Sequence, residues 1–184
     1  MIRPHRRAVL SALAASAALA ACAGAPPPPA IGPDGQPLPR AYRISGGEAR
    51  RVPFRALDAV NALRAGAGAA PVELDPELTA SAATHARDMS LQNRPWLFGS
   101  DGSSPIDRAA RAGFGGRLLG ETISESYESE LQTIVAWGED PATRRILLDP
   151  QARRMGFAFF QEPNGKLWWV LNMGSDPRAA APLA

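Results

Sequence analysis

The segment MGFAFFQEPNGKLWWVLNM, residues 155–173, decides the fold class of this 184-residue chain. Its large apolar residues alternate with other residues in two runs, Met155 to Phe159 and Leu167 to Met173. That period is typical of β-strands with one face buried. Pro163-Asn164-Gly165 separates the runs, and Asn and Gly tolerate the positive φ that a tight turn requires. The segment therefore predicts a C-terminal β-hairpin.

Two adjacent tryptophans lie in the second run of the hairpin. Because successive side chains of a strand point to opposite faces, we expect Trp168 and Trp169 on opposite sides of the sheet. Each then packs under its own layer of helices. We interpret both as sheet core rather than as part of a ligand cage.

The residues before the hairpin follow the period of helices. The expected helices cover residues 52–66, 76–94, 106–112, 128–137 and 141–148. Their expected core faces are Phe54, Leu57, Val60 and Leu63 or Arg64 in the first, Leu78, Ala82, His85 and Met89 in the second, and Leu131, Ile134, Val135 and Trp137 in the fourth. Helices followed by a terminal antiparallel strand pair define an α+β fold.

Residues 1–21 are predicted to be a lipoprotein signal peptide. Three arginines precede an apolar run that is too short to cross a bilayer as a mature helix. The run ends in Leu19-Ala20-Ala21-Cys22, which resembles a lipoprotein signal box in which Cys22 is acylated and becomes the new N-terminus. An ordinary signal peptide with an incidental cysteine is the alternative. The pair Arg6-Arg7 leaves both Sec and twin-arginine export open.

The rest of the chain divides into three parts. Residues 22–47 are rich in proline and glycine and are predicted to form an extended tether, 48–176 a folded domain, and 177–184 a loose tail. The net charge is +2, and removing the three arginines of the leader leaves −1. Without a basic stripe, nothing supports nucleic-acid binding. Because Cys22 is the only cysteine, no disulfide forms within the chain.

Short motifs occur in a fixed order between residues 61 and 174. They are Asn61 with Arg64, Leu74-Asp75-Pro76-Glu77-Leu78, His85-Ala86, Asp101-Gly102-Ser103-Ser104-Pro105, Arg108, Gly120-Glu121-Thr122-Ile123, Trp137 with Pro141 and Arg144, Gly156, and Trp169 with Met173-Gly174. This order resembles the bacterial branch of the CAP superfamily (cysteine-rich secretory proteins, antigen 5, pathogenesis-related 1). The resemblance implies an α-β-α sandwich around a three-stranded antiparallel sheet, and together with the signal box it indicates a lipoprotein member.

The resemblance also implies a cleft that holds two histidines and two acids in many members of the family. The matching positions in this chain are Leu97, Glu121, Asp140 and Thr143. Both histidine positions are therefore occupied by other residues, and Glu121 alone is unchanged. We expect a cleft with a degenerate His/Glu set.

Three residues are candidates for catalysis, and each also has a structural interpretation. If Glu121 is a buried carboxylate without an opposite charge, its pKa is raised and it suits proton transfer. If Glu121 is structural, its carboxylate accepts hydrogen bonds that fix the cleft wall. Asp140 precedes Pro141 and suits a helix N-cap. We interpret His85 as a packed side chain whose ring bonds to backbone or to a nearby acid. The resemblance agrees, since this histidine is not one of the two cleft histidines.

Two functions follow from these observations, and we favour the first. It is a non-catalytic, lipid-anchored module of the cell envelope that binds an apolar or lipid-like ligand, or an envelope protein, at a rim formed by residues 96–98. The alternative is a cell-envelope hydrolase that uses Glu121 with Asp140, which requires carboxyl groups about 5 to 10 Å apart across one groove. Neither function requires a cofactor. No Asp follows Cys22, which favours the outer membrane.

We predict that the chain without its leader has no zinc site. His5 leaves with the leader, so His85 is the one remaining histidine, and zinc sites nearly always draw on several His or Cys ligands. Ca²⁺ or Mg²⁺ held by Glu121, Asp140 and carbonyl oxygens is the alternative. Titration calorimetry with zinc chloride is expected to show no one-to-one complex of submicromolar affinity, and such a complex would contradict the prediction.

Overall fold

The computed structural model describes residues 42–126 and 128–176. The predicted leader, Cys22, most of the predicted tether and the tail lie outside these residues, and they stay predictions. The first described residues pack on the hairpin, since the backbone N–H of Ile44 donates to Gln161 and the Gln161 amide donates to the carbonyl of Tyr42. Within the described ranges, no helix is long and apolar enough to cross a membrane.

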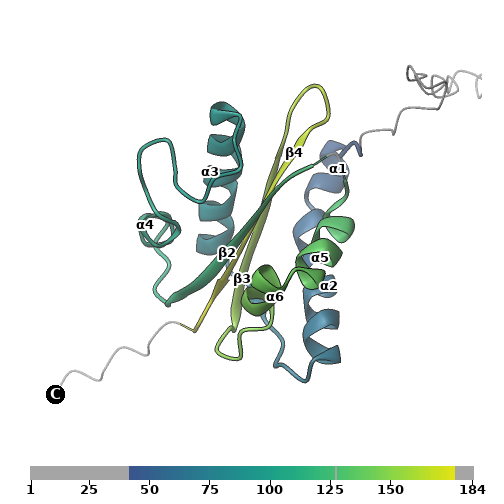
Figure 1. Ribbon diagram of the computed structural model, residues 1–184, viewed down its shortest axis with the longest axis vertical. Coiled ribbons are helices and arrows are strands. Elements are labelled where there is room, and N and C mark those ends of the chain that lie inside the picture. Colours follow the sequence, from purple (N-terminus) through teal and green to yellow (C-terminus); the bar gives the residue numbers. More distant parts are fainter. Residues whose placement is uncertain (1–41, 127, 177–184) are drawn as a thin grey trace, which may run out of the picture. The chain divides into compact units, whose positions relative to one another are not determined.

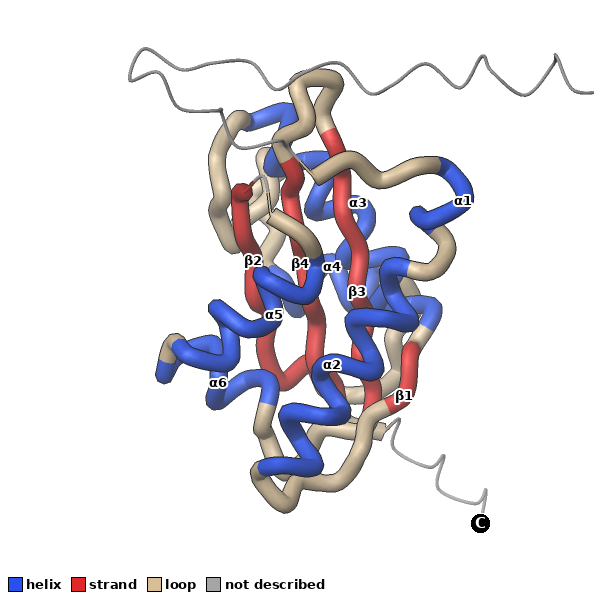
Figure 2. Tube along the Cα trace, turned by 90° about the vertical axis from the view of Figure 1, so that its right-hand side faces the viewer, coloured by secondary structure: helices blue, strands red, loops and turns tan. Residues whose placement is uncertain are grey.

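The centre of the fold is a four-stranded sheet with strand order β1-β3-β4-β2 (Figure 2). The strands are β1 (Glu73–Leu74), β2 (Leu118–Ser126), β3 (Arg154–Gln161) and β4 (Leu167–Gly174). β4 pairs antiparallel with β2 and β3, whereas β1 pairs parallel with β3 through two residues. The prediction of helices on a small sheet is confirmed. The three-stranded antiparallel description omits β1, which is too short to show an alternating pattern.

The predicted hairpin is present, with Phe159 opposite Trp169 and Gly165 at φ 101° in the turn. Trp169 packs in the large core cluster that contains Val60, and Trp168 packs on the other face with Met89. Both indoles are fully buried, as expected for two large side chains between two helix layers.

Helices cover both faces of the sheet, as Figure 1 shows. On one face lie α3 (Pro76–Gln92) and α4 (Pro105–Arg111), and on the other lie α2 (Val52–Gly66), α5 (Glu130–Glu139) and α6 (Pro141–Leu147). A single turn, α1 (Gly46–Ala49), precedes α2. The Asp75 carboxylate caps α3 by accepting from the N–H of Leu78 over 2.8 Å, which fixes the start of the helix that carries His85.

Two of the predicted helix faces are wrong in part. Helix α2 buries residues four apart, namely Val52, Ala56, Val60 and Arg64, so Phe54 is 62% exposed. In α5, Ile134 and Trp137 are buried as predicted, but Leu131 and Val135 are exposed. The inward face of α5 instead includes Glu130, which pairs with Arg55 over 2.5 Å.

The close packing of β3 on α3 generates a stability prediction. A Cβ added at Gly156 would lie 2.2 Å from the carbonyl carbon of Leu78, and helix backbone cannot yield as a side chain can. We expect Gly156→Ala to lower the free energy of unfolding by about 3 kcal/mol, at the upper end of overpacking costs. Urea denaturation followed by tryptophan fluorescence measures the loss.

Gly66→Ala is the matched control, because a Cβ at Gly66 meets nothing within 4 Å. Alanine is also the better helix former, so this variant is expected to be at least as stable as the parent chain. Equal urea midpoints for the two variants would contradict the packing argument.

Candidate functional site

Glu121 lies on β2 and points to the face covered by α3 and α4, where its side chain is completely buried. The Arg108 guanidinium donates to Oε1 of Glu121 over 2.7 Å. It also donates to the carbonyl oxygens of Leu97 and Ser103, each over 2.8 Å. Arg108 therefore supplies the opposite charge beside Glu121, a partner that the sequence analysis did not predict. Through Arg108, the pair fixes the loop between α3 and α4 at two carbonyl groups.

His85 lies on α3 beside this pair and is completely buried. Its Nε2 is 2.8 Å from the carbonyl oxygen of Trp96 and 3.6 Å from Oε1 of Glu121. Because a carbonyl only accepts, Nε2 carries the hydrogen and donates it. Burial, and then the charge of Arg108, lower the pKa of His85 to about 4, so the ring is neutral near pH 7. His85 thus adds a third attachment for the loop.

The carboxyl group of Glu121 is shifted in the opposite direction. Burial raises the pKa of Glu121 to about 7, although the Arg108 guanidinium opposes the shift. Because the pKa of Glu121 lies above that of the neighbouring His85, the carboxyl group takes up a proton in mildly acidic solution before the imidazole does. Sequence reasoning named both residues but did not place them in contact.

Asp140 does not face Glu121. It ends α5 and caps α6, where Oδ1 accepts from the backbone N–H groups of Thr143 over 3.0 Å and Ala142 over 2.8 Å. These bonds lower the pKa of Asp140. Asp140 is exposed on the α5–α6 side of the sheet, whereas the side chain of Glu121 points to the α3–α4 side. The two carboxyl groups therefore do not share a groove.

The two positions that replace the histidines also lie apart. Thr143 uses its hydroxyl group to donate to the carbonyl of Trp137 over 2.7 Å, which ties α6 to α5. Leu97 belongs to the loop on the opposite side and is 45% exposed. Arg144, in the same helix as Thr143, donates to the carbonyl of Gly138.

The loop holds an apolar surface of three consecutive residues, Trp96, Leu97 and Phe98, which are 51%, 45% and 54% exposed. We call these residues the apolar loop. His85 and Arg108 bind the carbonyl groups of the first two from inside, so the backbone is held inward while the side chains meet solvent. Large apolar side chains gathered in this way are typical of an interaction surface.

Within residues 42–126 and 128–176, no three His, Cys, Asp or Glu side chains come together in an arrangement that would hold a metal ion. Glu121 has an arginine as its nearest charged partner rather than a second acid.

The sequence model of the CAP family, described as the cysteine-rich secretory protein family, matches residues 57–173, so the chain belongs to this family. The match begins in α2 and ends in β4, and therefore spans both helix layers and the sheet.

Three bacterial proteins are similar to this chain. The chain is 24% identical over 114 residues to the protein YkwD of Bacillus subtilis (strain 168), which covers 62% of this chain and 44% of YkwD. An extracellular protein containing an SCP domain from Bacillus anthracis superposes with a TM-score of 0.64 at 17% identity, covering 73% of this chain and 45% of that one. An outer surface protein of Borrelia burgdorferi gives 0.64 at 15% identity, covering 74% and 99%. These structural likenesses show the fold, and the chain spans less than half of YkwD.

The opposite pKa shifts of His85 and Glu121 predict opposite pH dependences in single variants. Glu121→Gln keeps a histidine whose pKa falls from 6.5 to about 4 on folding, so its free energy of unfolding decreases as the pH drops through that window. His85→Gln keeps a carboxyl group whose pKa rises from 4.5 to about 7, so its free energy of unfolding decreases as the pH rises through that window.

In the parent chain the two trends offset each other. Urea denaturation of both variants across these windows measures the slopes, and the difference between the variants cancels the contribution of the other acidic groups. Equal slopes in the two variants would show that this buried group of charges is assigned wrongly.

Proposed function

We propose that this chain is a lipid-anchored CAP domain of the cell envelope that acts as a non-catalytic binding module. Its contact surface in this proposal is the apolar loop, and its ligand is an apolar or lipid-like molecule or an envelope protein. The main support is the use of Glu121, whose carboxyl group binds Arg108 and through it holds the loop carbonyls. The glutamate then supports a surface rather than a reaction.

The chemistry of the apolar loop supports binding by burial. Covering the exposed part of each of its three side chains is worth on the order of 1 kcal/mol or more. The Arg94 guanidinium lies 3.4 Å above the ring of Trp96 and places a positive charge beside this surface. A fixed backbone lowers the ordering cost of association.

The raised pKa of Glu121 suits the alternative hydrolase, but the second acid that this reaction needs is out of reach. It requires Glu121 and Asp140 across one groove, but Asp140 is engaged as a helix cap on the other side of the sheet. His85 uses its Nε2 hydrogen on the carbonyl of Trp96, so that nitrogen does not serve as a base.

The location outside the cytoplasm rests on the signal box and on the related proteins. The matched Bacillus anthracis protein is described as extracellular and the Borrelia burgdorferi protein as an outer surface protein. For this chain we propose acylation of Cys22, the outer membrane, and a tether that holds the domain some tens of Å from the bilayer, at about 3 Å per residue.

The test is a pull-down of the lipidated chain from native envelope, with lipids and proteins both identified. We expect a bound species that is lost when Trp96, Leu97 and Phe98 are all replaced by serine. A matched control replaces Phe54, Ile106 and Val135, which are exposed apolar residues elsewhere, and is expected to retain that species.

Glu121→Gln separates binding from catalysis. Glutamine keeps an acceptor for Arg108 but not the charge, so we expect this variant to capture the same species as the parent chain with lower affinity. Equal capture by the serine variant and its control would overturn the role of the apolar loop. Turnover of an envelope substrate that Glu121→Gln abolishes would overturn the non-catalytic assignment.

A further inference from the structure

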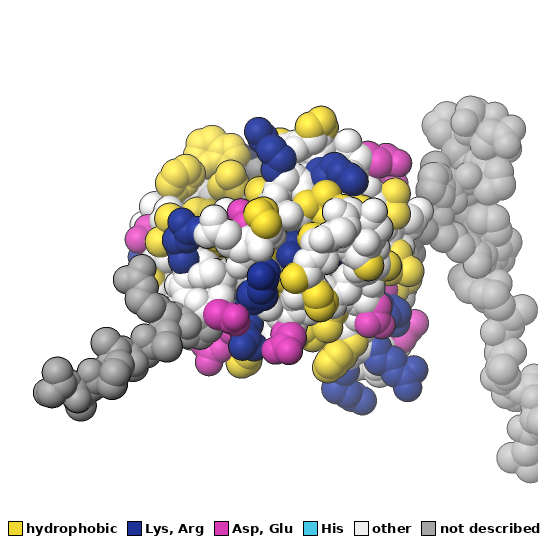
Figure 3. Space-filling view, turned by 90° about the horizontal axis from the view of Figure 1, so that it is seen from below, with side chains coloured by type: hydrophobic (Ala, Val, Ile, Leu, Met, Phe, Trp, Pro, Cys, Tyr) yellow, Lys and Arg dark blue, Asp and Glu magenta, His cyan; other side chains and the backbone are white. Residues whose placement is uncertain are grey.

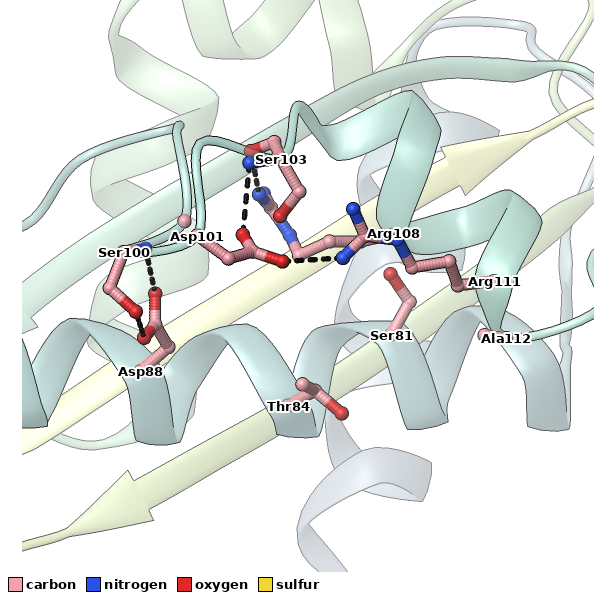
Figure 4. A pocket seen from close by; sticks show the side chains of 10 residues that line it. Ser81, Thr84, Asp88, Ser100, Asp101, Ser103, Arg108, Arg111 and Ala112 are labelled. Carbon is pink, nitrogen blue, oxygen red and sulfur yellow. Dashed lines mark hydrogen bonds and ion pairs between the residues drawn. The ribbon is translucent and has the colours of Figure 1, made fainter.

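A polar groove lies between α3, α4 and the loop 99–103, on the same side of the sheet as Glu121 but lined by other residues (Figure 4). Its volume is about 360 Å³, within the usual range for small-molecule sites. Helix α3 contributes Ser81, Thr84 and Asp88, and α4 contributes Arg108 and Arg111. None of the four cleft positions lines it, and the apolar loop ends just before it.

The charged groups of the groove are paired with one another or with hydroxyl groups. Arg111 and Asp101 form an ion pair over 2.5 Å. Asp88 accepts from the backbone N–H of Ser100 over 2.8 Å and from its hydroxyl group over 2.5 Å. Hydrogen bonds from Ser103 and from Arg111 hold the pKa of Asp101 well below its usual range, so it remains an acceptor. The groove thus has no unpaired charge that would select an ionic ligand.

Two buried donors of the groove have no hydrogen-bond partner. Ser81 is 2% exposed with its hydroxyl group unpaired, and Arg108 is 6% exposed with Nε unpaired. Figure 4 shows the Ser81 side chain rising from α3 toward Arg108. A buried polar group without a partner costs about 1–3 kcal/mol. Both donor atoms are covered, so a ligand acceptor regains that free energy where the Ser81 or Arg108 side chain turns toward it.

We propose that this groove binds a saccharide through its hydroxyl groups. A sugar hydroxyl group both donates and accepts, which suits a wall that offers donors at Ser81 and Arg108 and acceptors at Asp88 and Asp101. An anion would meet two carboxylates, a cation would meet two guanidinium groups, and an apolar ligand would offer no partner to the unpaired donors of Ser81 and Arg108.

The loop wall is formed in advance. The backbone N–H of Gly99 donates to the carbonyl of Ser103 and the N–H of Gly102 donates to the carbonyl of Gly99, each over 2.9 Å. The Arg108 guanidinium donates to the same Ser103 carbonyl. A pre-formed wall lowers the cost of ordering on binding. Saccharide binding in the groove does not use the apolar loop as a contact surface. The saccharide proposal and the proposed function of the apolar loop can therefore fail independently.

The test is an NMR titration of the full chain with cellobiose, maltose and N,N′-diacetylchitobiose, each added separately to millimolar concentration. We expect at least one to shift the backbone amide resonances of residues 81–88 and 99–103. Ser81→Ala is expected to weaken that binding about tenfold, the equivalent of one hydrogen bond of about 1.4 kcal/mol. Asp101→Asn is expected to weaken it as well.

Thr133→Val is the matched control, because Thr133 also has a buried, unpaired hydroxyl group on a helix, but on the opposite side of the sheet. Its affinity for the sugar is expected to equal that of the parent chain. Failure of all three sugars to shift these resonances would overturn the proposal. So would inorganic phosphate or glycine shifting them at equal affinity, or a Ser81→Ala variant that binds as the parent does.

Discussion

The buried ion pair between Arg108 and Glu121 is the constraint on which the loop between α3 and α4 depends. The loop has no strand or helix of its own, so several of its carbonyl groups need partners from other elements. Arg108 supplies two of them, and Glu121 supplies the charge that permits a guanidinium to lie 6% exposed. Removing either partner of such a pair leaves an uncompensated buried charge. This requirement gives the glutamate at position 121 a structural role.

Two different surfaces depend on the same guanidinium. Before residue 99 the loop presents apolar side chains to solvent, and after it the loop forms one wall of the polar groove. Because Arg108 binds carbonyl groups on both sides of this point, it positions both surfaces together. Figure 3 shows basic and acidic side chains interspersed on one end of the molecule.

Local patterns predicted those parts of the fold that neighbouring residues determine. The hairpin follows from alternation around Asn164-Gly165, and the start of α3 follows from Asp75 before Pro76. The pairing of Arg108 with Glu121 joins a short helix to a strand, and no periodicity within either element reveals it. Its only signal in the sequence was Arg108 itself, in a family motif. The same limit applies to Arg64, a fully buried cation that binds backbone carbonyl groups of the chain near residue 149.

Hydrogen exchange of the loop amides tests the central claim most directly. Arg108→Met removes the two hydrogen bonds from Arg108 to the loop carbonyls of Leu97 and Ser103. Near pH 6 the raised pKa of Glu121 lets that carboxyl group become neutral, so the fold can persist without the guanidinium. Arg87→Met, on the exposed face of α3, is the control. The account predicts faster exchange at Gly99 and Gly102 in Arg108→Met alone, with β3 and β4 unchanged. Exchange at these two glycines equal to that of the parent chain would show that Arg108 does not hold the loop.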